Sequence, residues 1–125
     1  MKWAKCKLKI YPCTFYFCAG GNAKEIKAKL KRLKLTPALA LTDDALDLGW
    51  TIKLTTHEGR TAILVWVLEC KKTPDDISIV VHECTHGLFY LLDYIDQEMP
   101  NYKGAEFITY LLDFIVEQAL NCYWK

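Results

Sequence analysis

Five residues near the middle of the 125-residue chain have the types and the spacing of a metal site with an adjacent base. They are His82-Glu83-Cys84-Thr85-His86, an H-E-x-x-H pentapeptide inside a predicted helix. Residues four apart share one face of a helix, so both imidazoles can bind the same metal ion. Glu83 lies one residue further round, where its carboxylate can take a proton from a water activated by the metal.

The alternative to a metal site is an ordinary helix with two incidental histidines, because short motifs also occur by chance. The chain has only three histidines, however, and two of them occupy the motif. The predicted helix runs from Pro74 to about Ile95 behind Thr73, a good N-cap. It is apolar nearly all round, which predicts a central, buried helix whose His82, Glu83 and His86 need polar partners. A bound metal would supply those partners.

A second long helix is predicted at about 105–122, after a turn. Phe107 and Phe114 are expected among its core positions. Another face carries a polar stripe at helical spacing, namely Glu106, Tyr110, Asp113 and Glu117. A solvated stripe would have the same pattern, except that Glu106 and Tyr110 lie among apolar neighbours.

The first part of the chain predicts a small sheet. Residues 4–18 alternate lysines with apolar residues and then become aromatic, which indicates a strand or a strand pair. A helix capped by Asn22 is expected over about 23–34, followed at 35–49 by a connection with one or two helical turns. Trp50 to Thr55 and Thr61 to Glu69 predict a β-hairpin that leads into the motif helix.

The length predicts a single domain over residues 1–125, and the predicted strands and helices give it an α+β fold. The expected architecture is a small mixed or antiparallel sheet whose hairpin packs on the H-E-x-x-H helix, with the second long helix following. A net charge of +1 argues against bulk attraction to nucleic acid or to an anionic membrane. The lysine-rich face of the helix at 23–34 is therefore interpreted as solvated.

No apolar run is long enough to span a membrane, and the N-terminus has no signal-like apolar region. The six cysteines lack a C-x-x-C spacing, which argues against a separate structural zinc site. These observations predict a cytoplasmic protein with reduced cysteines.

The pattern His82-Glu83-x-x-His86, followed after 19 residues by Glu106 on the next helix, resembles the thermolysin-like gluzincin peptidases. The resemblance covers about residues 50–122 and implies that His82, His86 and Glu106 hold Zn²⁺ while Glu83 is the general base. The stretch Glu106-Phe-Ile-Thr-Tyr110-Leu also resembles an element of small phage-encoded H-E-x-x-H proteins, for which the compartment would be the host cytoplasm.

The chain departs from the gluzincin pattern at two points. The aspartate that the family carries four residues after its glutamate ligand is replaced by Tyr110, so Tyr110 or Asp113 would have to support a zinc ligand. The family's transition-state-stabilising His or Tyr has no obvious counterpart, although Tyr102 or Tyr110 could substitute.

The sequence therefore predicts zinc-dependent hydrolysis of a peptide bond, with Glu83 moving the proton. A peptide or protein substrate would add as a strand to the edge of the hairpin, along Trp50–Thr55 or Thr61–Glu69. The alternative is a non-catalytic, zinc-stabilised interaction module, such as a phage factor that binds a host protein. Retention of Glu83 favours the enzyme, because a purely structural zinc site needs no carboxylate beside its ligands.

Overall fold

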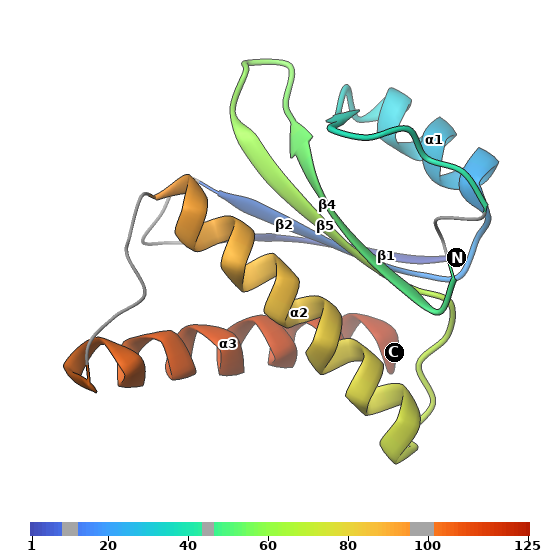
Figure 1. Cartoon of the computed structure of the whole chain (residues 1–125). Coiled ribbons are helices and arrows are strands. Elements are labelled where there is room, and N and C mark those ends of the chain that lie inside the picture. The colour runs from blue at the N-terminus through green and yellow to red at the C-terminus, as the bar shows by residue number, and fades with distance from the viewer. Residues whose placement is uncertain (9–12, 44–46, 96–101) are drawn as a thin grey trace.

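The computed structural model describes residues 1–8, 13–43, 47–95 and 102–125, the last segment with side chains from Glu106 onward. Its layers are a helix, a five-stranded mixed sheet, and a pair of long helices (Figure 1). The predicted α+β class and the hairpin-then-helix order are confirmed.

The sheet has the strand order β1-β2-β5-β4-β3. Its strands are β1 (Lys2–Lys7), β2 (Thr14–Ala19), β3 (Thr36–Pro37), β4 (Gly49–Thr55) and β5 (Thr61–Val67). β2 and β5 are parallel, while the other neighbouring strands are antiparallel. The nearly all-apolar sequence of β5 is explained by its place between β2 and β4, where both of its faces are covered.

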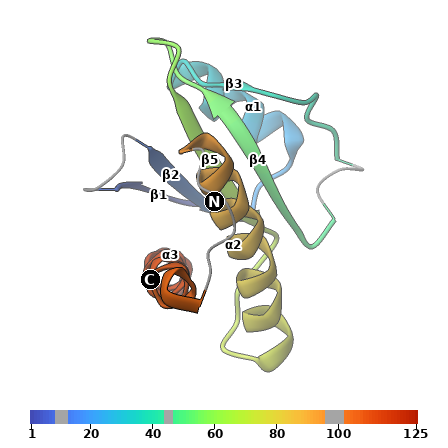
Figure 2. The same cartoon turned by 60° about the vertical axis from the view of Figure 1, so that its left-hand side comes forward.

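Alternation along the strands divides the interior into two cores, one on each face of the sheet. On β2, Phe15 and Phe17 pack beneath the two long helices, whereas Tyr16 and Cys18 pack beneath α1. Figure 2 shows α1 on the side of the sheet opposite to α2 and α3. Side chains on one face of the sheet are thereby separated from those on the other.

Helix α1 (Ala23–Arg32) begins with a capping box, in which Asn22 accepts from the Glu25 backbone and Glu25 accepts from the Asn22 backbone. The predicted N-cap is therefore confirmed. The helical turns expected between α1 and β4 are absent from the described residues of that connection, where β3 pairs with the end of β4 instead. Thr36-Pro37, a pair that can also begin a helix, is extended here because its backbone pairs with Thr55 and Leu54 of β4.

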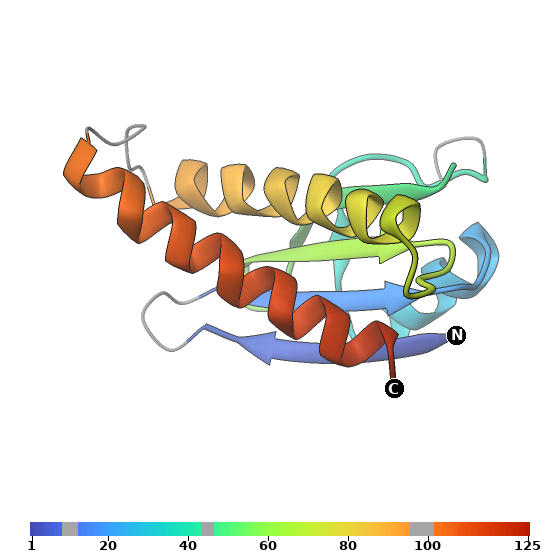
Figure 3. The same cartoon turned by 90° about the horizontal axis from the view of Figure 1, so that it is seen from below.

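Helix α2 (Pro74–Tyr94) begins at the predicted N-cap, with the Thr73 side chain accepting from the Asp76 backbone. It lies against β5 and β4 beside helix α3 (Tyr102–Tyr123), which crosses β2 and β1 (Figure 3). The buried stripe of α2 includes Val80, Cys84 and Leu91, so Cys84 packs into the core as its position suggested.

Two burial predictions are wrong. The motif helix is buried on only one side, and both His82 and His86 are exposed, because α3 packs beside α2 rather than over its outer face. Phe107 and Phe114 are likewise 36% and 40% exposed, since Ile115 and Ala119 take the core side of α3. Apolar character alone did not indicate which side of each helix meets the sheet.

All six cysteines are free thiols. Within the described segments, no helix is long and apolar enough to cross a membrane.

Candidate metal centre

The two motif histidines lie on the outer face of α2, one helical turn apart. Their Nε2 atoms are 3.2 Å apart and the ring planes are nearly perpendicular, at 82°. The i, i+4 spacing places both rings on the same face, as the sequence predicted. The rings therefore present two nitrogens to one point in space.

Glu83 is oriented differently from the histidines although it is adjacent to one of them. Its residue is 8% exposed and it points toward β4, whereas the His82 side chain is 68% exposed. The Glu83 Oε2 atom lies 4.0 Å from His82 Nε2. A carboxylate at this distance is near the histidine pair without being bonded to it, which is the arrangement that a proton acceptor beside a metal site requires.

The other carboxylate oxygen of Glu83 is held by Thr51 on β4. The Thr51 hydroxyl lies 2.7 Å from Glu83 Oε1 and 2.9 Å from the Glu83 backbone oxygen, and its single proton is shared between these acceptors. Both groups are buried, so this contact satisfies polar atoms that would otherwise be costly. Thr51 therefore fixes the carboxylate so that Oε2 is the oxygen directed toward the histidines.

Gly49 makes the approach of β4 to Glu83 possible. A Cβ at this position would lie 2.7 Å from Glu83 Cγ and 3.0 Å from Ile79 Cγ2. Such contacts are far below van der Waals separation, so only glycine allows this spacing between strand and helix. Sequence reasoning missed both Gly49 and Thr51; the signal that could have found them is the alternation of β4, whose second face includes both residues.

Lys53 lies on the same face of β4 as Gly49 and Thr51 and contacts α2 near the C-terminal end of that helix. Its Nζ lies 2.9 Å from Asp93 Oδ2 and stands 5.3 Å from the centre of the Tyr90 ring. Alternate residues 49, 51 and 53 thus contact the motif helix, while the intervening Trp50, Ile52 and Leu54 pack on the α1 side. The register of β4 is what sets the position of Glu83.

A cavity of about 280 Å³ opens beside the carboxylate, between the start of β4 and α2. Its lining includes Asp47, Gly49, Ser78, His82 and Glu83. The cavity offers a small ligand group access to Glu83 and to one motif histidine together.

The predicted third ligand lies on α3. Glu106 is exposed, and its Oε1 accepts a hydrogen bond from the Tyr110 hydroxyl at 3.0 Å. In the described part of the chain, no group of three or more His, Cys, Asp or Glu residues is arranged to hold a metal ion. The structure thus brings His82, His86 and Glu83 together but does not place Glu106 with them.

The remaining candidates are distributed along α3. Tyr110 is 64% exposed and its hydroxyl donates to Glu106, and its support of a zinc ligand stays a prediction. Asp113 lines a separate cavity between α2 and α3 together with Val81 and Glu117. The side chain of Tyr102 lies outside the described residues.

The thiol between the two histidines is not available for ligation in this arrangement. Cys84 is fully buried on the sheet side of α2, and burial, with a further contribution from the Glu83 carboxylate, raises its thiol pKa to about 12. Metal ligation by cysteine uses the thiolate. Cys84 is therefore a core residue.

Comparison with protein-family models, with curated proteins and with solved structures found no match for this chain. The argument for function consequently rests on the geometry of the site.

Proposed function

We propose that the chain is a zinc-dependent hydrolase of peptide bonds, with His82 and His86 as two of the metal ligands and Glu83 as the general base. The observation that carries the proposal is the convergence of the two Nε2 atoms, 3.2 Å apart, beside a buried carboxylate oriented by Thr51.

The histidine pair fits a zinc ion. Nitrogen ligands of tetrahedral zinc lie at about 2.0–2.1 Å from the metal, which corresponds to about 3.3 Å between two of them. The separation of 3.2 Å between the Nε2 atoms agrees with that value. Glu106 is the proposed third ligand, supported by the chain interval, by its exposure and by its contact with Tyr110.

When bound, zinc would polarise the substrate carbonyl and lower the pKa of the attacking water. Glu83 takes a proton from that water and returns it to the leaving amine. Thr51 keeps Oε1 occupied, so Oε2 is the atom that handles the proton. The cavity beside Glu83 is where the reacting carbonyl group would lie.

Of the two hairpin strands, β4 is the one suited to holding an extended substrate. β5 is paired on both sides, whereas the outer edge of β4 is paired by β3 at Leu54 and Thr55. No described strand pairs with the outer edge over Gly49–Ile52, the half of β4 next to the cavity. Strand addition here would place a peptide bond beside Glu83.

The test is metal analysis of the purified chain combined with a peptide-library digest of the wild type and of Glu83→Gln. We expect stoichiometric zinc in both proteins and a loss of cleavage of about 10²–10⁴-fold in the variant, because only the proton transfer is removed. Glu69→Gln, at an exposed carboxylate after β5, is the matched control and should cleave normally.

Cleavage that survives Glu83→Gln would overturn the general-base role, and a wild type without zinc would overturn the metal site. Zinc retention with no cleavage by either protein would favour the non-catalytic interaction module, the second of the two functions that the sequence left open.

A further inference from the structure

The charge of the chain is strongly segregated, although its net value is only +1. Ten of the sixteen lysines and arginines, but only one of the fifteen acidic residues, lie within residues 1–34. This segment forms β1, β2 and α1, and α1 covers the face of the sheet opposite to the motif helix. The net charge of the whole chain therefore does not indicate the local charge on either face of the sheet.

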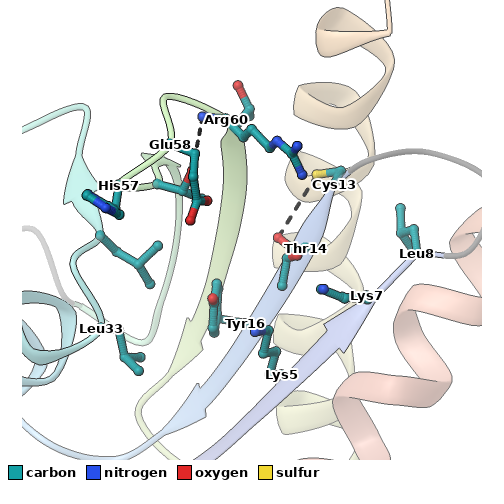
Figure 4. Close-up of a pocket in the computed structure, with 13 residues that line it drawn as sticks. Lys5, Lys7, Leu8, Cys13, Thr14, Tyr16, Leu33, His57, Glu58 and Arg60 are labelled. Atoms are coloured by element: carbon teal, nitrogen blue, oxygen red, sulfur yellow. Dashed lines mark hydrogen bonds between the residues drawn. The ribbon is translucent and has the colours of Figure 1, made fainter.

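Two adjoining cavities lie on the α1 side of the molecule. The first, about 410 Å³, is bounded by β1, β2 and the turn between β4 and β5 (Figure 4). The second, about 460 Å³, lies between α1, β3 and the same turn. Leu35 and His57 line both cavities, so the two adjoin, and we describe them together as one groove.

Six cationic side chains line this groove, which we call the basic groove: Lys5, Lys7, Lys27, Lys31, Lys34 and Arg60. Lys5 and Lys7 stand on one face of β1, two residues apart, and Lys27 and Lys31 lie one turn apart on α1. Lys34 follows just after the end of α1. Figure 4 shows Lys5, Lys7 and Arg60 around the first cavity.

Described carboxylates do not neutralise the groove cations by ion pairing. Lys53 and Lys71 each lie within 4.0 Å of a carboxylate, whereas none of the six groove cations does so among the described residues. Among the described residues, the one carboxylate lining the groove is Glu58. Burial, followed by the negative charge of Glu58, raises the pKa of Tyr16, which lines the same cavity.

Lys34 adds an observation from the backbone. It has φ of 57°, in the left-handed region, directly after the C-cap Leu33. The bonds from the Lys34 backbone to Lys31 and from the Leu35 backbone to Leu30 form a Schellman motif, in which this position is usually glycine. A lysine tolerated at a strained position places another charge in the groove.

We propose that the basic groove binds the phosphodiester backbone of a nucleic acid, without base specificity. A row of unneutralised cations along a concave channel matches a polymer with repeated negative charges, whereas a single small anion would occupy only one of the two cavities. Among the described lining residues there is no Phe or Trp and Tyr16 is buried, which favours backbone contacts over base stacking. The groove lies across the sheet from the metal centre and does not depend on its function.

The experiment is fluorescence anisotropy with labelled single-stranded and double-stranded oligonucleotides of about 20 nucleotides, each in two unrelated sequences, at several salt concentrations. We expect binding that is similar for both sequences and that weakens linearly in log–log form with added salt, because bound phosphates release counterions.

The test variant is Lys5→Gln/Lys7→Gln/Arg60→Gln, and the matched control is Lys24→Gln/Lys71→Gln/Lys125→Gln, which removes three exposed charges outside the groove. The test variant should lose at least about tenfold in affinity and reduce the salt slope by about 2–3, against less than about threefold for the control. Lys27→Gln/Lys31→Gln, at exposed positions of α1, repeats the test should the triple variant fail to fold. Glu58→Gln should bind more tightly than the wild type.

Equal losses in the test and control variants would overturn the proposal, because net charge would then explain the binding. No binding at about 50 mM salt would also overturn it, since phosphate contacts are strongest there. Binding to vesicles containing phosphatidylserine, with none to oligonucleotides, would assign the groove to a membrane surface and reject a nucleic acid.

Discussion

The two faces of the sheet carry their functional side chains in different ways. On the α2 face, the histidine pair comes from five consecutive residues, and β4 supplies the groups that orient Glu83. On the α1 face, the groove draws its cations from β1, α1 and the β4–β5 turn. The first is a compact site built on a helix; the second is a charged surface assembled from distant segments.

The candidate metal centre and the basic groove also differ in how deeply their charged side chains are buried. Glu83 is buried and oriented by a hydrogen bond, which suits the general-base role that we propose for it. The lysines lining the groove are exposed and have no carboxylate partner among the described residues, which suits charges that act together on a polyanion. Of these two sets of side chains, only Glu83 on the α2 face is held in position by a hydrogen bond.

The largest expected effect is on zinc affinity. His82→Ala and His86→Ala should each weaken zinc binding by more than about 100-fold, because even residues that only support a ligand contribute about 10–100-fold. His57→Ala, in the groove, is the matched control and should leave affinity unchanged. Competition with a chelating indicator measures all three. An equal effect of His57→Ala would place the metal on the other face.

Alkaline pH should destabilise both faces, because each buries a thiol, Cys13 just before β2 and Cys18 on β2. Burial raises the pKa of Cys13, beneath the long helices, to about 11, and chiefly burial raises that of Cys18, beneath α1, to about 12. Both values exceed the ordinary value of 9.0, so the unfolded chain ionises first and stability falls as pH rises above 9. Each thiol should cost about 1 kcal/mol at pH 10.

Urea denaturation at pH 8 and pH 10 measures this loss of stability. The Cys13→Ala/Cys18→Ala variant should lose about 2 kcal/mol less than the wild type between these two pH values. The same loss in both proteins would exclude the two thiols as the cause.

The contact between Thr51 and Glu83 has a smaller predicted effect on stability. Thr51→Val keeps the side-chain shape but leaves Glu83 without its buried donor, which should lower the free energy of unfolding by about 1–2 kcal/mol. It should also lower peptide cleavage, because Oε2 is no longer directed toward the histidines. Thr51→Ser retains the hydroxyl and should restore most of the cleavage; failure of that rescue would show that Thr51 acts through packing.

The smallest predicted effect concerns Lys34 and has opposite signs for stability and binding. Lys34→Gly should raise the free energy of unfolding by about 0.5–1 kcal/mol, because glycine adopts positive φ without strain. It should also weaken oligonucleotide binding. Lys34→Ala removes the same charge but keeps the strain, so it should weaken binding equally without added stability. Different binding by the two variants would show that backbone geometry, rather than charge, matters at this position.

Local signals in the sequence were sufficient for the elements around the site. The caps Asn22 and Thr73, the hairpin and the i, i+4 pair of histidines each depend on residues a few positions apart, and the structure confirms them. The burial of α2 was predicted wrongly, because apolar periodicity does not state where a neighbouring helix packs. The third ligand remains a prediction from the chain interval.

The sequence by itself determined the two imidazoles on one helix face, because helical geometry fixes the relation between residues four apart. Only the tertiary structure decided that Glu83 turns inward to Thr51 and Gly49, because that contact depends on the register of β4 against α2. The basic groove likewise required the fold, since its lysines are distributed over separate segments and a net charge of +1 conceals them. Long-range packing, unlike helical spacing, cannot be predicted from a short stretch of residues.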